Sequence, residues 1–342
     1  MIRKLLLLVL LVVLAGILGV QELKKRWQLP LTLPAGGTPL LVQPGESLRA
    51  VARRLHENGV MRYPKLLILY ARWTGADQQI KHGEYLLTSP LTSAQLLNLL
   101  QLGKVLQYQV TLPEGITLAR AIAILGGAGQ LESVLEGVAD PAILEMVAPY
   151  ENPEGWFFPD TYHFSRGATD AQLLQRANAR MLQVLGEEWQ DRAAELPYEN
   201  PYDALIMASI IERETGLPEE REQIAGVFVR RLQRGMRLQT DPTVIYGLGT
   251  TFDGNLRRSH LKDDSNLYNT YRIHGLPPTP IALPGRGSIH AALHPADGTA
   301  LFFVARGDGG HVFSATLAEH QAAVRKYQLQ RKKNYRSSPG KS

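Results

Sequence analysis

Residues 203–216 read DALIMASIIERETG, an apolar run that closes on two glutamates. Asn200 can cap a helix that begins here, and Pro201 suits the first helical turn. Gly216, followed by Pro218, ends the helix. The sequence therefore predicts one buried helix with carboxyl groups at its C-terminal end.

The first glutamate of this run, Glu212, has the features of a general acid. Helical spacing places it on the same face as Ala208 and Ser209, whose small side chains let a ligand approach closely. The helix dipole in the last turn and burial beside Ile211 both disfavour a negative charge. Both effects would raise the pKa of Glu212, as a general acid near neutral pH requires. Periodicity alone favours a solvated glutamate at a helix end.

Glu214 lies two positions further on, about 200° around the helix. It therefore does not easily share a pocket with Glu212. A surface charge, or an ion pair with Arg213 or Arg221, is the simpler interpretation, and a contact with substrate is the alternative.

A second polar segment, RLQTDPTVIYG at 237–247, lies in a Pro- and Gly-rich region that we expect to form short strands and turns up to residue 296. Its polar groups, with those of YNTY at 268–271, could bind sugar hydroxyls, and aromatic faces stack on sugar rings. Asp241 before Pro242 also fits a helix cap. The candidate substrate-binding residues are Ser209, Glu214, Gln239, Thr240, Asp241, Tyr246, Asn269, Tyr271 and His311.

Neither a metal nor a cofactor is predicted. The chain has no cysteine. His290 and His294 stand four residues apart, but Ala291 replaces the glutamate of a zinc-protease motif, and no neighbouring carboxylate supplies a third ligand. The sequence contains no P-loop, nucleophile elbow or dinucleotide fingerprint. The net charge of +5 on 342 residues is far from a nucleic-acid-binding composition.

The N-terminus predicts a membrane anchor. Leu5 to Val20 is an unbroken apolar run of 16 residues, which spans roughly 24 Å as a helix, and flanking basic residues can snorkel. Residues 16–20 make a poor cleavage site, so we favour an uncleaved anchor over a signal peptide. Basic residues on both sides leave the orientation open, although Arg3 and Lys4 favour a cytoplasmic N-terminus.

Between the anchor and residue 150, two strand–turn–helix starts resemble each other: Val42 to Leu48 and Val110 to Leu118. They are either a weak internal repeat or the same turn chemistry used twice. The predicted helices are 48–58, 64–73, 92–100, 170–195, the two that follow Asn200 and Leu217, and 318–331; the predicted strands are 40–43, 83–87, 110–112, 301–306 and 310–313.

Several motifs, in order, resemble the endolytic murein transglycosylases, the MltG or YceG-like family. They are EGWFFPDTY (154–162), ASIIERET (208–215), RLQTDPTVIYG (237–247), YNTY (268–271), GLPP (275–278) and His311-x-Phe313, after which Ser314 stands where Asn is expected. The resemblance implies that Glu212 is the catalytic glutamate. It also implies a single-pass inner-membrane protein whose enzyme domain lies in the periplasm, beside peptidoglycan synthases (penicillin-binding proteins), cutting nascent strands and so setting their length.

The predicted fold class is therefore α+β, with a transmembrane helix, a small LysM-like α/β unit and a mixed catalytic domain. The expected segments are 1–4 (cytoplasmic), 5–22 (anchor), 23–38 (linker), 39–105 (LysM-like), 106–150 (connecting), 151–331 (catalytic) and 332–342 (basic disordered tail).

One carboxyl group suffices for this reaction. Ordinary glycosidases need two carboxyl groups, whereas a lytic transglycosylase uses the C6 hydroxyl of the sugar itself in place of water. Two alternatives remain: a hydrolytic muramidase that uses Glu212 with Asp241, and a non-enzymatic envelope scaffold that binds glycan through the LysM-like unit.

Overall fold

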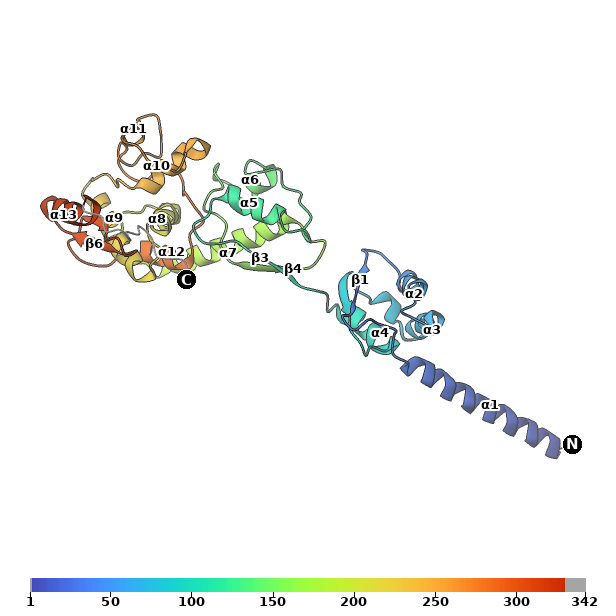
Figure 1. Ribbon diagram of the computed structural model, residues 1–342. Helices are drawn as coiled ribbons and strands as arrows, with labels where there is room; N and C mark the ends of the chain where they lie inside the picture. Colours follow the sequence, from blue (N-terminus) through green and yellow to red (C-terminus); the bar gives the residue numbers. More distant parts are fainter. Residues whose placement is uncertain (1, 330–342) are drawn as a thin grey trace. The chain divides into compact units, whose positions relative to one another are not determined.

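A computed structural model gives the fold and describes residues 2–329 (Figure 1). The predicted tail at 332–342 lies outside the described residues. The chain divides into two compact units, one formed by residues 1–108 with 163–167 and the other by 109–162 with the remainder. The division falls within a two-stranded sheet of β3 (Tyr108–Thr111) and β4 (Thr161–Phe164).

The first unit has the order strand, helix, helix, strand, helix after a long N-terminal helix. Its elements are α1 (Ile2–Gln28), β1 (Thr38–Val42), α2 (Leu48–Glu57), α3 (Pro64–Thr74), a 3₁₀ turn (Ala76–Gln78), β2 (Gly83–Leu87) and α4 (Ser93–Leu102). Strands β1 and β2 pair antiparallel, with Leu40 opposite Tyr85. The core includes Leu67 and Leu96, both with no exposed surface, so α3 and α4 contribute to a single apolar interior.

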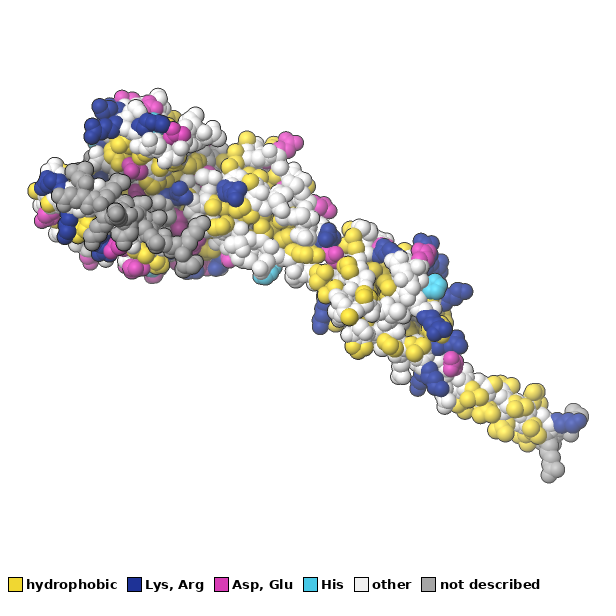
Figure 2. Space-filling model, in the orientation of Figure 1, with side chains coloured by type: hydrophobic (Ala, Val, Ile, Leu, Met, Phe, Trp, Pro, Cys, Tyr) yellow, Lys and Arg dark blue, Asp and Glu magenta, His cyan; other side chains and the backbone are white. Residues whose placement is uncertain are grey.

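Helix α1 is long and apolar enough to span a membrane. Residues Lys4–Gln28 have a mean hydropathy of 2.5 in the most apolar window, and none of that window is buried in the protein. The apolar side chains of α1 cover its surface in Figure 2. A signal sequence has the same properties.

The two similar turns noted in the sequence have the same construction. Gly45 and Gly115 both adopt φ +75°, a left-handed conformation that glycine reaches without strain. Ser47 and Thr117 then cap α2 and α5, each accepting a backbone N–H from three residues on. The turn chemistry is therefore shared, whether or not the segments are repeats.

The second unit is mostly helical. Its elements are α5 (Leu118–Gly126), α6 (Pro141–Val147), α7 (Asp170–Gln190), α8 (Pro201–Glu214), a 3₁₀ turn (Pro218–Glu220), α9 (Arg221–Gln233), α10 (Asp241–Leu248), a 3₁₀ turn (Gly249–Thr251), α11 (Arg258–Leu261), α12 (Arg286–Leu293), β5 (Phe302–Ala305), β6 (His311–Ser314), α13 (Leu317–Val324) and a π-helical turn (Arg325–Leu329). Strands β5 and β6 form the predicted antiparallel hairpin.

Helix α8 is the centre of this unit. Every residue from Ala204 to Ile211 is buried, because α7, α9, α10 and α12 all pack against the helix (Figure 1). A helix that is apolar on all sides is stable only in such surroundings. The capping residues are those predicted: the Asn200 side chain accepts the Asp203 N–H, and Pro201 occupies the first turn.

Two predictions about secondary structure were wrong. Residues 237–296 contain α10, α11 and α12 in place of short strands. Pro242 occupies the first turn of α10, where proline favours a helix. Asp241 begins that helix, and Thr240 is its cap residue. Helix α7 ends at Gln190, five residues early, before Glu195 adopts φ +60°, which a helix cannot accommodate.

Candidate active site

The two glutamates at the end of α8 face different surroundings, as their spacing predicts. Glu212 points toward the first turn of α12. Glu214, the last residue of α8, points toward Thr240 at the start of α10. The helix therefore presents two buried carboxyl groups to two separate environments.

The carboxylate of Glu212 is enclosed by donors. Its Oε2 accepts the Ser288 hydroxyl at 2.7 Å and the Gly285 N–H at 3.1 Å. Its Oε1 lies 3.6 Å from Nη2 of Arg221, which also contacts Glu114 at 3.2 Å. Burial raises the pKa of Glu212, as the sequence predicts, although the Ser288 hydrogen bond opposes the shift. Only 6% of the side chain is exposed, so these contacts leave little room for a ligand.

Glu214 has a different environment. Burial raises its pKa to about 7, the hydrogen bond donated by the Thr240 hydroxyl opposes the rise, and the Asp241 charge adds to it. The protonated form of this carboxyl group is therefore accessible near neutral pH. Such a group can give up or accept a proton with little cost. It is neither the surface charge nor the ion pair with Arg213 or Arg221 that the sequence favoured.

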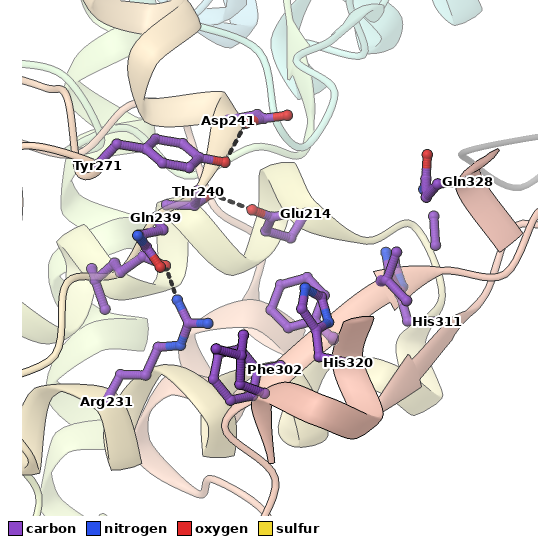
Figure 3. Close-up of a pocket in the computed structure, with 15 residues that line it drawn as sticks. Glu214, Arg231, Gln239, Thr240, Asp241, Tyr271, Phe302, His311, His320 and Gln328 are labelled. Carbon is purple, nitrogen blue, oxygen red and sulfur yellow. Dashed lines mark hydrogen bonds between the residues drawn. The ribbon is translucent and has the colours of Figure 1, made fainter. Parts of the chain in front are cut away.

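Glu214 lines a polar cavity of about 600 Å³ (Figure 3). Six of the residues predicted from sequence meet there: Glu214, Gln239, Thr240, Asp241, Tyr271 and His311. They come from α8, from the segment that begins α10, from the loop before residue 272 and from β6. The cavity has the size of a small-ligand site.

Contacts among these residues fix the cavity wall. The Tyr271 hydroxyl donates to Asp241 Oδ1 at 2.7 Å, and the Thr240 N–H donates to the Thr270 hydroxyl at 3.0 Å. Gln239 holds a left-handed backbone with φ +53°, which is costly for a residue with a Cβ and is typical of functional sites. His311 is tied by Nδ1 to Glu220 Oε2 at 2.7 Å.

Among the cavity residues that sequence reasoning missed are Arg231, Phe302 and His320. The Arg231 guanidinium lies 5.1 Å above the Phe302 ring and donates to the carbonyls of Leu301 and Leu238. The His320 ring also stacks on the Phe302 ring, with the two ring centroids 5.2 Å apart. These residues belong to α9, β5 and α13, and no local pattern in the sequence links them.

Tyr246 lines a second cavity of about 940 Å³. Its hydroxyl donates to Oε2 of Glu154 at 3.3 Å, and the Leu118 N–H donates to the other oxygen at 2.9 Å. Burial raises the pKa of Glu154 to about 7, against the opposing Leu118 and Tyr246 hydrogen bonds. The predicted substrate-binding set is thus divided between two cavities.

Ser209 and Asn269 have no exposed surface and line neither cavity. The Ser209 hydroxyl donates to the Ile206 carbonyl and accepts the Ile281 N–H at 2.9 Å. The Asn269 amide donates to the carbonyls of His260 and Asp263. Both side chains join backbone segments, and substrate binding by them stays a prediction without support from the geometry.

The histidine pair of α12 has a carboxylate neighbour that the sequence did not reveal. Glu188 of α7 lies with Oε2 2.8 Å from His290 Nδ1. His290 and His294 therefore do have a neighbouring carboxylate, contrary to the expectation from the sequence, because α7 packs against α12.

Sequence and structure comparisons place the protein in a family. The second unit has buried carboxyl groups at the end of its central helix, α8. The model of the YceG-like family matches residues 40–326, which include that helix. The chain belongs to the YceG-like family.

The chain is similar to proteins named endolytic murein transglycosylase. That of Bacillus subtilis (strain 168) is 31% identical over 301 residues, covering 83% of this chain and 82% of the relative. That of Streptococcus pneumoniae serotype 2 is 27% identical over 307 residues, and the match spans 55% of its length. The crystal structure of a yceG-like protein from Listeria monocytogenes has 28% identity and a TM-score of 0.55, covering 84% of this chain and 99% of that one.

Proposed function

We propose that this chain is an endolytic lytic transglycosylase of peptidoglycan. It would cleave the β-1,4 bond between N-acetylmuramic acid and N-acetylglucosamine inside nascent strands, leave 1,6-anhydro ends and so terminate elongation. Family membership over residues 40–326 and the names of the relatives support the enzyme class. The observation that carries the site is one carboxyl group, Glu214, with a pKa of about 7 in a polar cavity.

Glu214 fits the role of general acid better than Glu212, the residue implied by the family resemblance. Glu212 lines neither of the two cavities described above and is held by Ser288, Gly285 and Arg221. These donors oppose the rise in pKa that burial causes, and they occupy the oxygens that would have to face a substrate. Glu214 accepts one side-chain hydrogen bond and faces the space that a sugar ring could fill. We therefore propose Glu214 as the catalytic residue and a structural role for Glu212.

The reaction needs one proton carrier. Protonated Glu214 gives its proton to the glycosidic oxygen as the bond from that oxygen to C1 of the muramic residue breaks. The resulting carboxylate then takes the proton of the C6 hydroxyl of the same sugar, and O6 closes on C1. One C–O bond is lost and one is formed, no water is added, and Glu214 ends protonated. The cavity walls would orient the sugar through Gln239, Tyr271 and His311.

Two matched variants test the assignment. Glu214→Gln should fold and release anhydro-muropeptides from purified sacculi at least about 100-fold more slowly than the native chain, as expected for loss of a general acid. Glu212→Gln keeps its shape and should retain most of the activity. Mass spectrometry of the released fragments measures both. The reverse result would return the catalytic role to Glu212, and full activity in both variants would exclude the mechanism.

A hydrolytic muramidase is the competing reaction, because Asp241 shares the cavity with Glu214. Its pair would be Glu214 with Asp241, since Glu212 does not line that cavity. The products differ by one water: reducing ends carry it and anhydro ends do not. Reducing ends alone would exclude the transglycosylase.

The setting of the enzyme is also proposed. The order β1–α2–α3–β2 with an antiparallel strand pair supports a LysM-like unit at residues 39–105. Helix α1 supports a single-pass anchor in the inner membrane. The second unit would then work in the periplasm beside peptidoglycan synthases. Pull-down of those synthases by the full chain from solubilised membranes, lost when residues 1–22 are removed, would test that proximity.

A further inference from the structure

A cluster on the far end of α12 from Glu212 has the donor set of a metal site. Glu188, His290 and His294 each offer one ligand atom, and the three atoms lie within 4.8 Å of one another. Two imidazoles and a carboxylate are ligands that zinc and other divalent transition metals prefer.

The imidazoles are already arranged in parallel. His290 and His294 lie one turn apart at the end of α12, with ring centroids 4.1 Å apart and planes inclined by 19°. Their side chains are 45% and 25% exposed, so an ion can reach them from solvent. Two histidines at this spacing on one helix can bind the same ion.

The carboxylate comes from the neighbouring helix and is held in place. Only 7% of the Glu188 side chain is exposed. Its Oε1 accepts Nε–H of Arg286 at 2.7 Å, while Oε2 faces His290 Nδ1 at 2.8 Å. An ion bound to Oε2 would leave the Arg286 contact intact, and such outer contacts orient metal ligands.

In its neutral form, His294 has one ring nitrogen that accepts hydrogen bonds but faces a carbonyl oxygen instead of a donor. Nε2 lies 2.8 Å from the Asp191 carbonyl and Nδ1 lies 3.2 Å from the His290 carbonyl. A neutral imidazole has one N–H, so it can donate to one of these carbonyls only. The other nitrogen turns a lone pair toward an oxygen, which a bound cation would relieve.

We propose that Glu188, His290 and His294 bind a divalent transition-metal ion that ties α7 to α12. A water or the Asp191 carboxylate, which lies 3.9 Å from His294 Nε2, completes the four ligands of a structural zinc site. The ion is structural and does not depend on which glutamate is catalytic. It would steady α12, whose cap residue Gly285 and first-turn residue Ser288 both donate to Glu212.

Calorimetric titration with Zn²⁺ tests the site. The full chain is purified in detergent without a polyhistidine tag and stripped with a chelator. We expect one site per chain, with affinity at least tenfold weaker in His290→Ala and in His294→Ala. His82→Ala removes an exposed histidine of the first unit and should leave the affinity unchanged.

A second measurement separates binding from folding. Saturating Zn²⁺ should raise the melting temperature of the native chain and of His82→Ala by several degrees, and should not raise that of the His290→Ala/His294→Ala double variant. Glu188→Gln keeps the shape of the side chain and should weaken binding. Absence of saturable binding by the native chain, or equal binding by the double variant, would overturn the proposal.

Discussion

A carboxyl group that begins a reaction as an acid must hold its proton at the working pH. Burial raises the pKa of Glu214 to about 7, with the Asp241 charge adding to the effect of burial. The rate of anhydro-end release should therefore fall above about pH 7, approaching tenfold per pH unit as the protonated fraction declines. Initial rates on sacculi between about pH 5 and 9 measure this decline, which is the alkaline limb of the pH–rate profile. A rate that keeps rising through pH 8 would contradict Glu214 as the acid.

The Thr240 hydroxyl offers a way to move that limb. Its hydrogen bond to Glu214 favours the charged carboxylate and lowers the pKa. Thr240→Val has nearly the same shape but no donor, so the alkaline limb should shift to higher pH by roughly 0.5–1 unit. Ser288→Ala, which removes a donor to Glu212, is the matched control and should leave the limb where it is.

Glu214 should also cost stability at alkaline pH. Its pKa is about 7 in the folded protein and near 4.5 in an unfolded chain, so the folded state holds the proton more tightly. The stability this provides is complete below about pH 4.5 and is lost as pH rises through 7. Glu214→Gln should thus be more stable than the native chain at pH 8, by at most roughly 3 kcal/mol, and not at pH 4. Urea unfolding at the two pH values measures the difference; Glu154 is present in both proteins and cancels.

At the scale of elements, Glu212 links the end of α8 to the start of α12. Ser288 has no exposed surface, and its hydroxyl and the Gly285 N–H both point at this carboxylate. Ser288→Ala leaves a buried acceptor with one partner fewer, which should reduce the free energy of unfolding by about 1–3 kcal/mol. Unfolding in urea measures that loss. A large fall in catalytic rate at a temperature where the variant is fully folded would count against a structural role for Glu212.

Elements that rest on local chemistry could be predicted from the sequence, and the site could be predicted only in part. Helix α8 follows from Asn200, Pro201 and its apolar run, all of which act within a few residues. The predicted polar segment at 239–241 does reach the cavity. The choice between Glu212 and Glu214 could not be made, because it depends on α12 covering one face and α10 the other. Arg231 and His320 are similarly brought to the cavity by long-range packing alone.

For the whole molecule, the apolar surface of α1 is left uncovered by residues 2–329 and needs a partner such as lipid. Each large apolar side chain between Leu5 and Leu23 is at least half exposed. Burying such a surface in lipid is strongly favourable. We expect the full chain to stay in the membrane fraction after carbonate extraction. A chain without residues 1–22 should be soluble, because the exposed apolar run is removed. The first unit should stay folded, because Trp27, which packs on it with its ring centroid 4.4 Å from that of Tyr70, is retained.

An anchor and a signal peptide both have an apolar helix of this length. The intact mass of the chain in each fraction distinguishes them. An anchor leaves the intact mass of the membrane-bound chain unchanged, whereas cleavage removes roughly 2 kDa or more and releases the enzyme from the membrane. The truncated chain should still cut purified sacculi, because Glu214 and its cavity belong entirely to the second unit. Its activity on strands growing at the membrane should fall, because the anchor would no longer hold the enzyme near them. Equal activity on growing strands would show that α1 does not position the enzyme.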